Sequence, residues 1–255
     1  MSTELNFKPK ILGIVCNWCC YGGADLCGVS RFQYPPYIRL IRVMCSARVD
    51  LTHILRAFSN GQDAVFVGGC HIGDCHYVTH GNYHTLSLIS ICKKLLGHLG
   101  VNPERLRLEW VSAGEGIRFA EVMNDFAGSV KKLGPLGKAE RIDEKGLKVK
   151  LEAAAKLVPY IRLVERERLR LSVKTEEEYH KFFTSEEFNR LFNTLIADKL
   201  AISEILLLLA ESPLSTGEIA EKLALSPSEA SRHINSSSRQ GLVRYDEGLK
   251  RFALA

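Results

Sequence analysis

Cysteines dominate the chemistry that this chain could perform. The sequence holds eight of them among 255 residues, and all lie in the first 92: Cys16, Cys19, Cys20, Cys27, Cys45, Cys70, Cys75 and Cys92. A disulfide framework is unusual in a cytosolic protein of this size, so metal ligation or thiol chemistry is the better interpretation. Iron–sulfur clusters use thiolate ligands, and zinc accepts thiolates together with histidine.

Two cysteine pairs have the spacing of ligand-bearing loops. Two residues separate Cys16 from Cys19, and four separate Cys70 from Cys75, so a single loop can present both sulfurs of each pair. Cys45, at the end of another predicted strand, could approach the same metal site from a third side. Glycines beside Cys70 leave room for a cluster and for backbone N–H groups that face its sulfides. We therefore predict a [2Fe–2S] cluster that is held by four of these five cysteines.

Two other interpretations of the cysteines stay open. His71 and His76 stand beside the third cysteine loop, and mixed Cys/His ligand sets suit zinc, although zinc motifs are usually tight paired knuckles. The alternative is a thiol–disulfide site at Cys16 and Cys19, which follow a predicted strand. A dithiol site would leave Cys45 and the third loop unexplained.

The remaining cysteines, Trp18 and the histidines are expected to have structural roles. Cys20 and Cys27 are expected to pack, and Cys92 lies on the apolar stripe of a helical pattern. We interpret Trp18 as a packing residue. The histidines 71, 76, 80 and 84 are interpreted as polar contact residues, not as ligands.

Apolar segments and helical patterns alternate through the first 133 residues. Strands are expected at 10–16, 38–45, 64–67 and 106–111, and helices up to about 32, after Ser46 as a cap, at 82–99 and at 117–133. This β-α-β-α-β-α-β-α order predicts an α/β domain with a parallel sheet and right-handed crossovers. The carboxyl ends of parallel strands share one edge, so we expect the five cysteines, which follow three strands, to meet there.

The sequence predicts three parts. These are an iron–sulfur α/β domain at 1–137, a helical linker or arm at 138–183, and a small winged helix-turn-helix-like domain at 184–255. The helical pattern at 151–171 is either a solvated connection or an arm that lies across a partner. In the last part, a candidate recognition helix spans 228–239, with Arg232 and Arg239, and a hairpin at 242–254 forms the wing.

Charge and hydropathy limit the classes of partner that we expect for this chain. The chain carries a net charge of +5, but residues 180–255 hold 9 Lys+Arg against 10 Asp+Glu, a net of −1. DNA binding needs a basic surface, so DNA is disfavoured as a partner. The sequence has no apolar run of bilayer length, and residues 1–8 lack the apolar core of a signal peptide. We predict a cytoplasmic protein.

Six motifs resemble one family. They are Cys16-Asn-Trp-Cys19, Tyr21-x-Gly23-Ala-Asp25, Gln33-Tyr-Pro-Pro36, Arg42-Val-Met-Cys45, Gly69-Cys-His-x-Gly-Asp-Cys-His-Tyr77 and Gly81-Asn-Tyr-His84. Over about residues 10–137 the chain closely resembles the delta subunit of methyl-viologen-reducing hydrogenase. The resemblance implies one [2Fe–2S] cluster at Cys16, Cys19, Cys45, Cys70 and Cys75. Cys20, Cys27 and Cys92 fall outside the motifs.

The resemblance also implies partners. Members of this family pass electrons between an oxidoreductase and the flavin-bearing subunit of heterodisulfide reductase, which carries FAD and [4Fe–4S] clusters and bifurcates electrons. The tail beyond residue 137 resembles extended forms found beside such subunits in anaerobic bacteria. The further oxidoreductase would be a hydrogenase, a formate dehydrogenase or another flavin enzyme.

Three functions follow from these observations. The first is an electron-transfer subunit with no substrate chemistry of its own. The second is a redox-responsive iron–sulfur transcription regulator that binds DNA through the winged helix. The third is a scaffold that zinc stabilises.

Overall fold

The computed structural model describes residues 7–78, 80–172 and 175–255. The first six residues, which form most of the segment where we predicted no signal peptide, lie outside the described residues. The chain forms two compact units, Met1–Lys148 with Arg170–Ser185, and Val149–Leu169 with Glu186–Ala255. The division at residues 137 and 183 stays a prediction.

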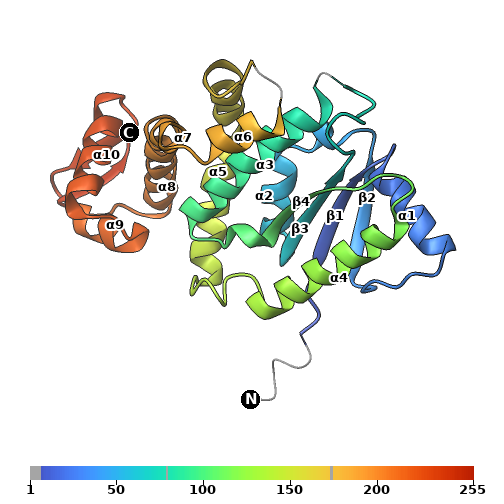
Figure 1. Cartoon of the computed structure of the whole chain (residues 1–255). Coiled ribbons are helices and arrows are strands. Elements are labelled where there is room, and N and C mark those ends of the chain that lie inside the picture. The colour runs from blue at the N-terminus through green and yellow to red at the C-terminus, as the bar shows by residue number, and fades with distance from the viewer. Residues whose placement is uncertain (1–6, 79, 173–174) are drawn as a thin grey trace. The chain divides into compact units, whose positions relative to one another are not determined.

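A four-stranded parallel sheet forms the centre of the first unit. Its order is β2-β1-β3-β4 (Figure 1), and its strands are β1 Ile11–Cys16, β2 Ile38–Val43, β3 Ala64–Gly69 and β4 Leu106–Trp110. Every residue of β3 is buried, because β3 is a central strand. The edge strand β2 exposes Arg39, Ile41 and Arg42. The predicted fold class of this part is confirmed.

Helices cover both faces of the sheet. Figure 1 shows α1 and α4 on one face and α2 and α3 on the other. Their bounds are α1 Cys20–Val29, α2 Leu51–Ser59, α3 Gly81–Leu99 and α4 Gly116–Leu133, with short 3₁₀ turns η2 Ser46–Arg48 and η3 Pro103–Arg105. Right-handed crossovers between parallel strands produce this arrangement.

The start of α2 differs from our prediction. Asp50, not Ser46, caps the helix, because its carboxylate accepts a hydrogen bond from the backbone N–H of Thr52 at 2.8 Å, and His53 completes a capping box. Ser46 is instead buried in the η2 turn. The predicted stop at Asn60 and Gly61 is found, and Gly61 has a φ of 77°.

Two helices follow the sheet. The long helix α5 Glu144–Arg168 carries the chain from the first unit into the second. The chain then returns to the first unit as α6 Glu176–Phe183, a helix that we did not predict. Thr175 caps α6, and Tyr179 of α6 packs against Tyr83 of α3 with ring centroids 5.4 Å apart.

The second unit adds a helix-turn-helix arrangement and a hairpin. Its elements are α7 Glu186–Phe192, the π-helical turn η4 Asn193–Ala197, α8 Asp198–Glu211, α9 Thr216–Leu223, α10 Pro227–Arg239, β5 Val243–Asp246 and β6 Arg251–Leu254. Ile205, Ile219, Ile234 and Val243 lie in its core. β5 and β6 pair antiparallel. The predicted winged helix-turn-helix-like architecture is confirmed.

Within the described ranges, no helix combines the length and the apolar character that a bilayer span requires.

Candidate metal centre

The first turn of α3 brings two of the predicted ligands together. An added Cβ at Gly81 would overlap the sulfur of Cys75 and would lie 3.2 Å from the sulfur of Cys45. The thiols of Cys45 and Cys75 therefore sit beside one another against the start of the helix. Only glycine fits here, since any side chain would occupy the space of the sulfurs.

Two polar side chains of the same helix fasten the cysteine loops. The buried amide of Asn82 donates hydrogen bonds to the carbonyl oxygens of Cys70 at 3.4 Å and of His71 at 2.9 Å. The hydroxyl of Thr85 lies 2.9 Å from Oγ of Ser46, the residue after Cys45. Helix α3 thus fixes the loop after β3 and the turn after β2 in one geometry.

A second sulfur pair lies at the ends of β1 and β3. The sulfurs of Cys16 and Cys70 are 3.6 Å apart, and both residues are buried. The pKa of Cys16 is lowered to about 6, chiefly by the hydrogen bond with Cys70; burial opposes this shift, and hydrogen bonds from the backbone N–H groups of Cys19, Cys20 and Trp18 add to it. The pKa of Cys70 is raised, chiefly because it is the donor of that hydrogen bond. The pair therefore holds one negative charge near neutral pH.

The two pairs belong to one connected set. Cys19 is half-buried and interacts with Cys70, where it contributes to the raised pKa of that thiol. Burial is the main cause of the raised pKa of Cys45, and the nearby Cys75 and Cys16 add to it. The structure thus brings together all five cysteines that we predicted to meet at the carboxyl edge.

Helix starts contribute a favourable field at this edge. α1, α3 and α4 all begin there, and none of the three has a side-chain cap. The N-terminus of a helix carries a partial positive charge, which stabilises thiolates. This edge therefore favours anionic sulfur ligands.

The other three cysteines have structural roles. The sulfur of Cys20 packs so closely against Gly68 that no Cβ would fit there, and burial raises its pKa. The thiol of Cys27 donates to the carbonyl oxygen of Phe32 at 3.5 Å. Cys92 is fully buried in α3.

The histidines beside the cysteines make polar and aromatic contacts. Nε2 of His71 lies 2.7 Å from the carboxylate of Glu115. The pKa of the Glu115 carboxyl is lowered, mainly by the hydrogen bond from the backbone N–H of Ser112 and next by the hydrogen bond with His71. His76 stacks on Trp18, with ring centroids 4.1 Å apart and planes 18° apart. Trp18, which we interpreted as a packing residue, packs on this histidine at the surface, with 41% of its area exposed.

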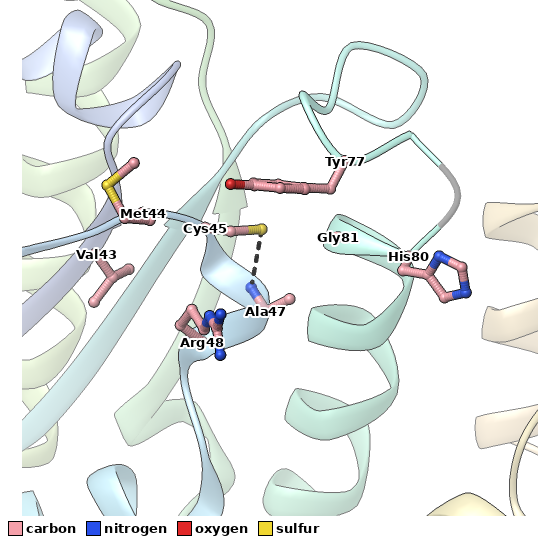
Figure 2. Close-up of a pocket in the computed structure, with 8 residues that line it drawn as sticks. All are labelled: Val43, Met44, Cys45, Ala47, Arg48, Tyr77, His80 and Gly81. Atoms are coloured by element: carbon pink, nitrogen blue, oxygen red, sulfur yellow. Dashed lines mark hydrogen bonds between the residues drawn. The ribbon is translucent and has the colours of Figure 1, made fainter.

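A pocket of about 530 Å³ opens beside Cys45. Figure 2 shows the ring of Tyr77 over the side chain of Cys45, with Met44 in the same turn as Cys45 and His80 beyond Gly81. The backbone N–H of Ala47 donates to the sulfur of Cys45 at 3.4 Å. Within residues 7–78, 80–172 and 175–255, no group of three or more His, Cys, Asp or Glu side chains has the arrangement of a single-ion site, and the thiols lie as two pairs instead.

Sequence reasoning gave no role to the residues that position the thiols, although Gly81 and Asn82 stand in one of the six motifs. Gly81, Asn82 and Thr85 set the relative places of the cysteine loops, and Arg48 lines the pocket. The available signal was a glycine followed by asparagine at the start of a helical pattern. Glycine and asparagine both disfavour helix formation, so their place in the first turn indicates a role other than forming the helix.

The candidate DNA contacts of the second unit are partly engaged within that unit. Two guanidinium nitrogens of Arg232 in α10 lie 3.1 and 3.4 Å from the carboxylate of Asp198 in α8. His233 is buried, and burial lowers its pKa. Both arginines of α10 are exposed, and among the described residues only Arg232 forms an ion pair.

Two family profiles match the chain. The profile of the methyl-viologen-reducing hydrogenase delta subunit matches residues 11–134. The profile of the arsR family of bacterial regulatory proteins matches residues 203–245. The first match covers every cysteine of the connected set, and the second covers α9, α10 and parts of the flanking elements.

Curated relatives extend the first match. An iron–sulfur subunit of an F420-non-reducing hydrogenase from Archaeoglobus profundus is 51% identical over 135 residues, which are 53% of this chain and 96% of the relative. An iron–sulfur subunit of the same kind from Methanococcus voltae is 51% identical over 142 residues, 54% of this chain and 98% of the relative.

A third relative carries the same segment inside a larger protein. One subunit of the ferredoxin/F(420)H(2)-dependent CoB-CoM heterodisulfide reductase from Methanosarcina acetivorans is 45% identical over 129 residues, 51% of this chain and 16% of the relative. Because the chain spans nearly the full length of the two hydrogenase relatives at 51% identity, it belongs to the methyl-viologen-reducing hydrogenase delta subunit family.

Proposed function

We propose that this protein is an electron-transfer subunit that holds one [2Fe–2S] cluster at the carboxyl edge of its sheet. The observation that carries the proposal is the connected set of five thiols from three loops, which contains two close sulfur pairs. The names of the hydrogenase relatives, which describe iron–sulfur subunits, support it.

The sulfur pairs suit a two-iron cluster. Two thiolates on one tetrahedral metal, with bonds of about 2.3 Å, lie about 3.8 Å apart, and the sulfurs of Cys16 and Cys70 are 3.6 Å apart. These two would hold one iron, and Cys45 and Cys75, which meet at Gly81, would hold the other. Cys19 is then the fifth cysteine, beside the first pair.

A cluster of this type accepts and donates one electron at a time. The chain supplies the surroundings of that centre. Cys16, Cys45, Cys70 and Cys75 are buried and would keep a bound metal away from bulk water, and the backbone N–H groups at the start of α1 stabilise negative charge on sulfur. We assign no substrate chemistry to the protein itself.

The proposed partners follow from the relatives. In two Methanosarcina proteins that are named as heterodisulfide reductase subunits, a segment like this one is part of the same polypeptide. We propose that a separate heterodisulfide reductase-like subunit with a flavin, at which electrons bifurcate, receives electrons from this chain. A hydrogenase, a formate dehydrogenase or another flavin enzyme would be the donor. The cytoplasmic location stays a prediction.

Metal and sulfide analysis of the anaerobically purified protein tests the cluster. We expect about two iron atoms and two acid-labile sulfides per chain, with an electron paramagnetic resonance signal after one-electron reduction. Zinc without sulfide would refute the cluster and favour the scaffold function. A folded protein with neither metal nor sulfide after cluster reconstitution would refute both.

The redox-responsive transcription regulator is not favoured. The arsR-family match points toward it, but Arg232 is paired with Asp198, and residues 180–255 carry a net charge of −1, from 9 Lys+Arg and 10 Asp+Glu. A gel-shift titration of the full chain with genomic fragments at low salt checks this choice. Tight binding to particular sequences would overturn it.

A further inference from the structure

Each of the three loops that carry the thiols also exposes a large apolar side chain. Trp18 lies in the loop after β1, Met44 in the turn after β2, and Tyr77 and Val78 in the loop after β3, with exposed fractions of 41, 54, 46 and 64%. Apolar side chains that gather on a surface mark interaction sites. We call these four residues, together with His76, the apolar rim.

Ring contacts and a shared pocket join the members of the rim. Trp18 stacks on His76, and His76 meets Tyr77 edge-on with ring centroids 5.1 Å apart. Tyr77 and Met44 line the pocket beside Cys45 (Figure 2). The rim therefore runs from the first cysteine loop to the second, and it is continuous with a cavity in its surface.

The charge of the pocket is cationic. Arg48 is exposed on its wall, and Arg42, which neighbours the lining residue Val43, lies over the ring of Tyr21 at 4.7 Å. Among the residues that the structure describes, neither arginine pairs with a carboxylate. An occupant that carries a carboxylate would complement them.

The rim also lies beside a proposed ligand residue. Cys45 forms part of the pocket wall, whereas Cys16 and Cys70 do not line it. A group seated in the pocket would contact a proposed ligand residue directly. The rim extends beyond the pocket over the stack of Trp18 and His76, which a molecule of pocket size would leave uncovered. These features fit a protein better than a small ligand.

We propose that the apolar rim and its pocket are the docking surface for a redox partner protein, whose contact loop presents an apolar side chain next to a carboxylate. This inference rests on the proposed function, because it assigns the route by which the centre exchanges electrons. The apolar contact supplies the affinity, and the arginines orient the partner.

Photo-cross-linking of the full, cluster-loaded chain tests the surface. The photoreactive amino acid p-benzoylphenylalanine replaces Met44 or Tyr77, and in the control it replaces Ile117, which is 57% exposed on α4. We expect the first two positions to cross-link to one redox-cofactor subunit of the native host, at a peptide that contains Asp or Glu. Cross-links to this subunit from position 117 alone, or to a second copy of the chain, would overturn the proposal.

Charge variants measure the same contact with the subunit that cross-linking identifies. Met44→Glu and Arg48→Glu should each weaken its binding about tenfold or more, and Ile117→Glu should not. If Met44→Glu lowers the iron content, Arg48→Glu and Val78→Glu carry the test. Unchanged binding in these variants overturns the docking surface while the cluster stands. A wild-type chain without iron and sulfide refutes the proposed function instead.

Discussion

Three helix starts at the cysteine edge differ from those of the helix-turn-helix, although α2 and α6 of the first unit are capped by Asp50 and Thr175. In the second unit, α9 and α10 start with complete capping boxes, formed by Ser215 with Glu218 and by Ser226 with Glu229. In the first unit, α1, α3 and α4 start without a side-chain cap at the cysteine edge. There, the backbone N–H groups at the start of α1 point to the sulfur of Cys16.

This difference separates helix starts whose N–H groups are already bonded from helix starts that are open to an anion. A capped helix start has satisfied its own N–H groups, whereas an uncapped one offers a positive end to an anion. Ion pairs occur in both units, for example between Arg105 and Glu140 in the first, but the arginine beside Cys45 differs. Arg232 pairs with Asp198, and Arg251 with Glu218, inside the second unit. Arg48 at the cysteine edge has no such partner among the described residues. Helix N-termini also contact phosphates in DNA-binding proteins. In α9 and α10 the capping side chains already bond to these N–H groups.

The strongest way to break the comparison is to remove a thiol. Cys70→Ser should reduce the iron content from about two atoms per chain to nearly none, because one of the two thiolates of the first pair is lost. Cys92→Ser, in the core of α3, should leave the iron content unchanged. Iron and sulfide analysis measures both. Equal loading of the two variants would show that the cysteine edge is not the ligand site.

A methyl group at the start of α3 is the next largest change. Gly81→Ala would push its Cβ into the sulfurs of Cys75 and Cys45, so we expect low cluster loading and a stability loss of about 1–3 kcal/mol from overpacking. The matched control is Gly128→Ala in α4, where nothing lies within 4 Å of the new Cβ. This control should gain about 0.4–1 kcal/mol. Normal loading of Gly81→Ala would contradict the sulfur positions.

Glu204 is an exception to the internal pairing of the second unit. Burial raises the pKa of its carboxyl to about 7, and the charge of Lys150 offsets this only in part. The folded state prefers the neutral acid, so this stabilisation is complete below the unfolded pKa of about 4.5 and is lost as the pH rises through about 7.

The variant Glu204→Gln stays neutral at every pH. At pH 8.5 it should be more stable than the wild type by up to about 3 kcal/mol, and at pH 5 the two should differ little. Denaturant unfolding followed by circular dichroism measures the difference. Tryptophan fluorescence would not serve, because both tryptophans, Trp18 and Trp110, lie in the first unit. The exposed Glu221→Gln is the control. An equal difference at both pH values would rule out titration as the cause.

The smallest effect is expected at Cys19, and it sharpens the account of the five thiols. Cys19→Ser should keep its iron and sulfide, since the two sulfur pairs lie elsewhere. The reduction potential should shift slightly, because the residue interacts with Cys70. Protein-film voltammetry gives the potential. Loss of iron would make Cys19 a ligand, and Cys16→Ser would then reveal whether Cys16 is the fifth cysteine.

The sequence was sufficient for the sheet and for the edge where the thiols meet. Apolar strands that alternate with helical patterns permit few topologies, and the parallel order then brings the ends of β1, β2 and β3 to one side. The convergence of Cys16, Cys45 and Cys70 followed from that rule alone. It needed no knowledge of loop conformations.

The pairing of the sulfurs was beyond the sequence. Cys45 lies past the end of β2, and Asn82 and Thr85 of α3 hold the two loops that bring it to Cys75. Such contacts depend on loop paths, which spacing does not encode. Helix α6 escaped prediction for another reason, because its acidic start at 176–178 resembled the charged linker before it.

The neighbouring places of β1, β2 and β3 in the sheet have a consequence for assembly. A cofactor bound to cysteines after all three strands would act as a cross-link that closes a loop of roughly 60 residues, and such a closure is worth on the order of 4 kcal/mol in chain entropy. Metal insertion and the last step of folding would then be coupled. In a newly made chain, cofactor binding would fix the ends of three strands in one step. Loss of the cofactor would destabilise the sheet at the edge where we propose that the partner binds.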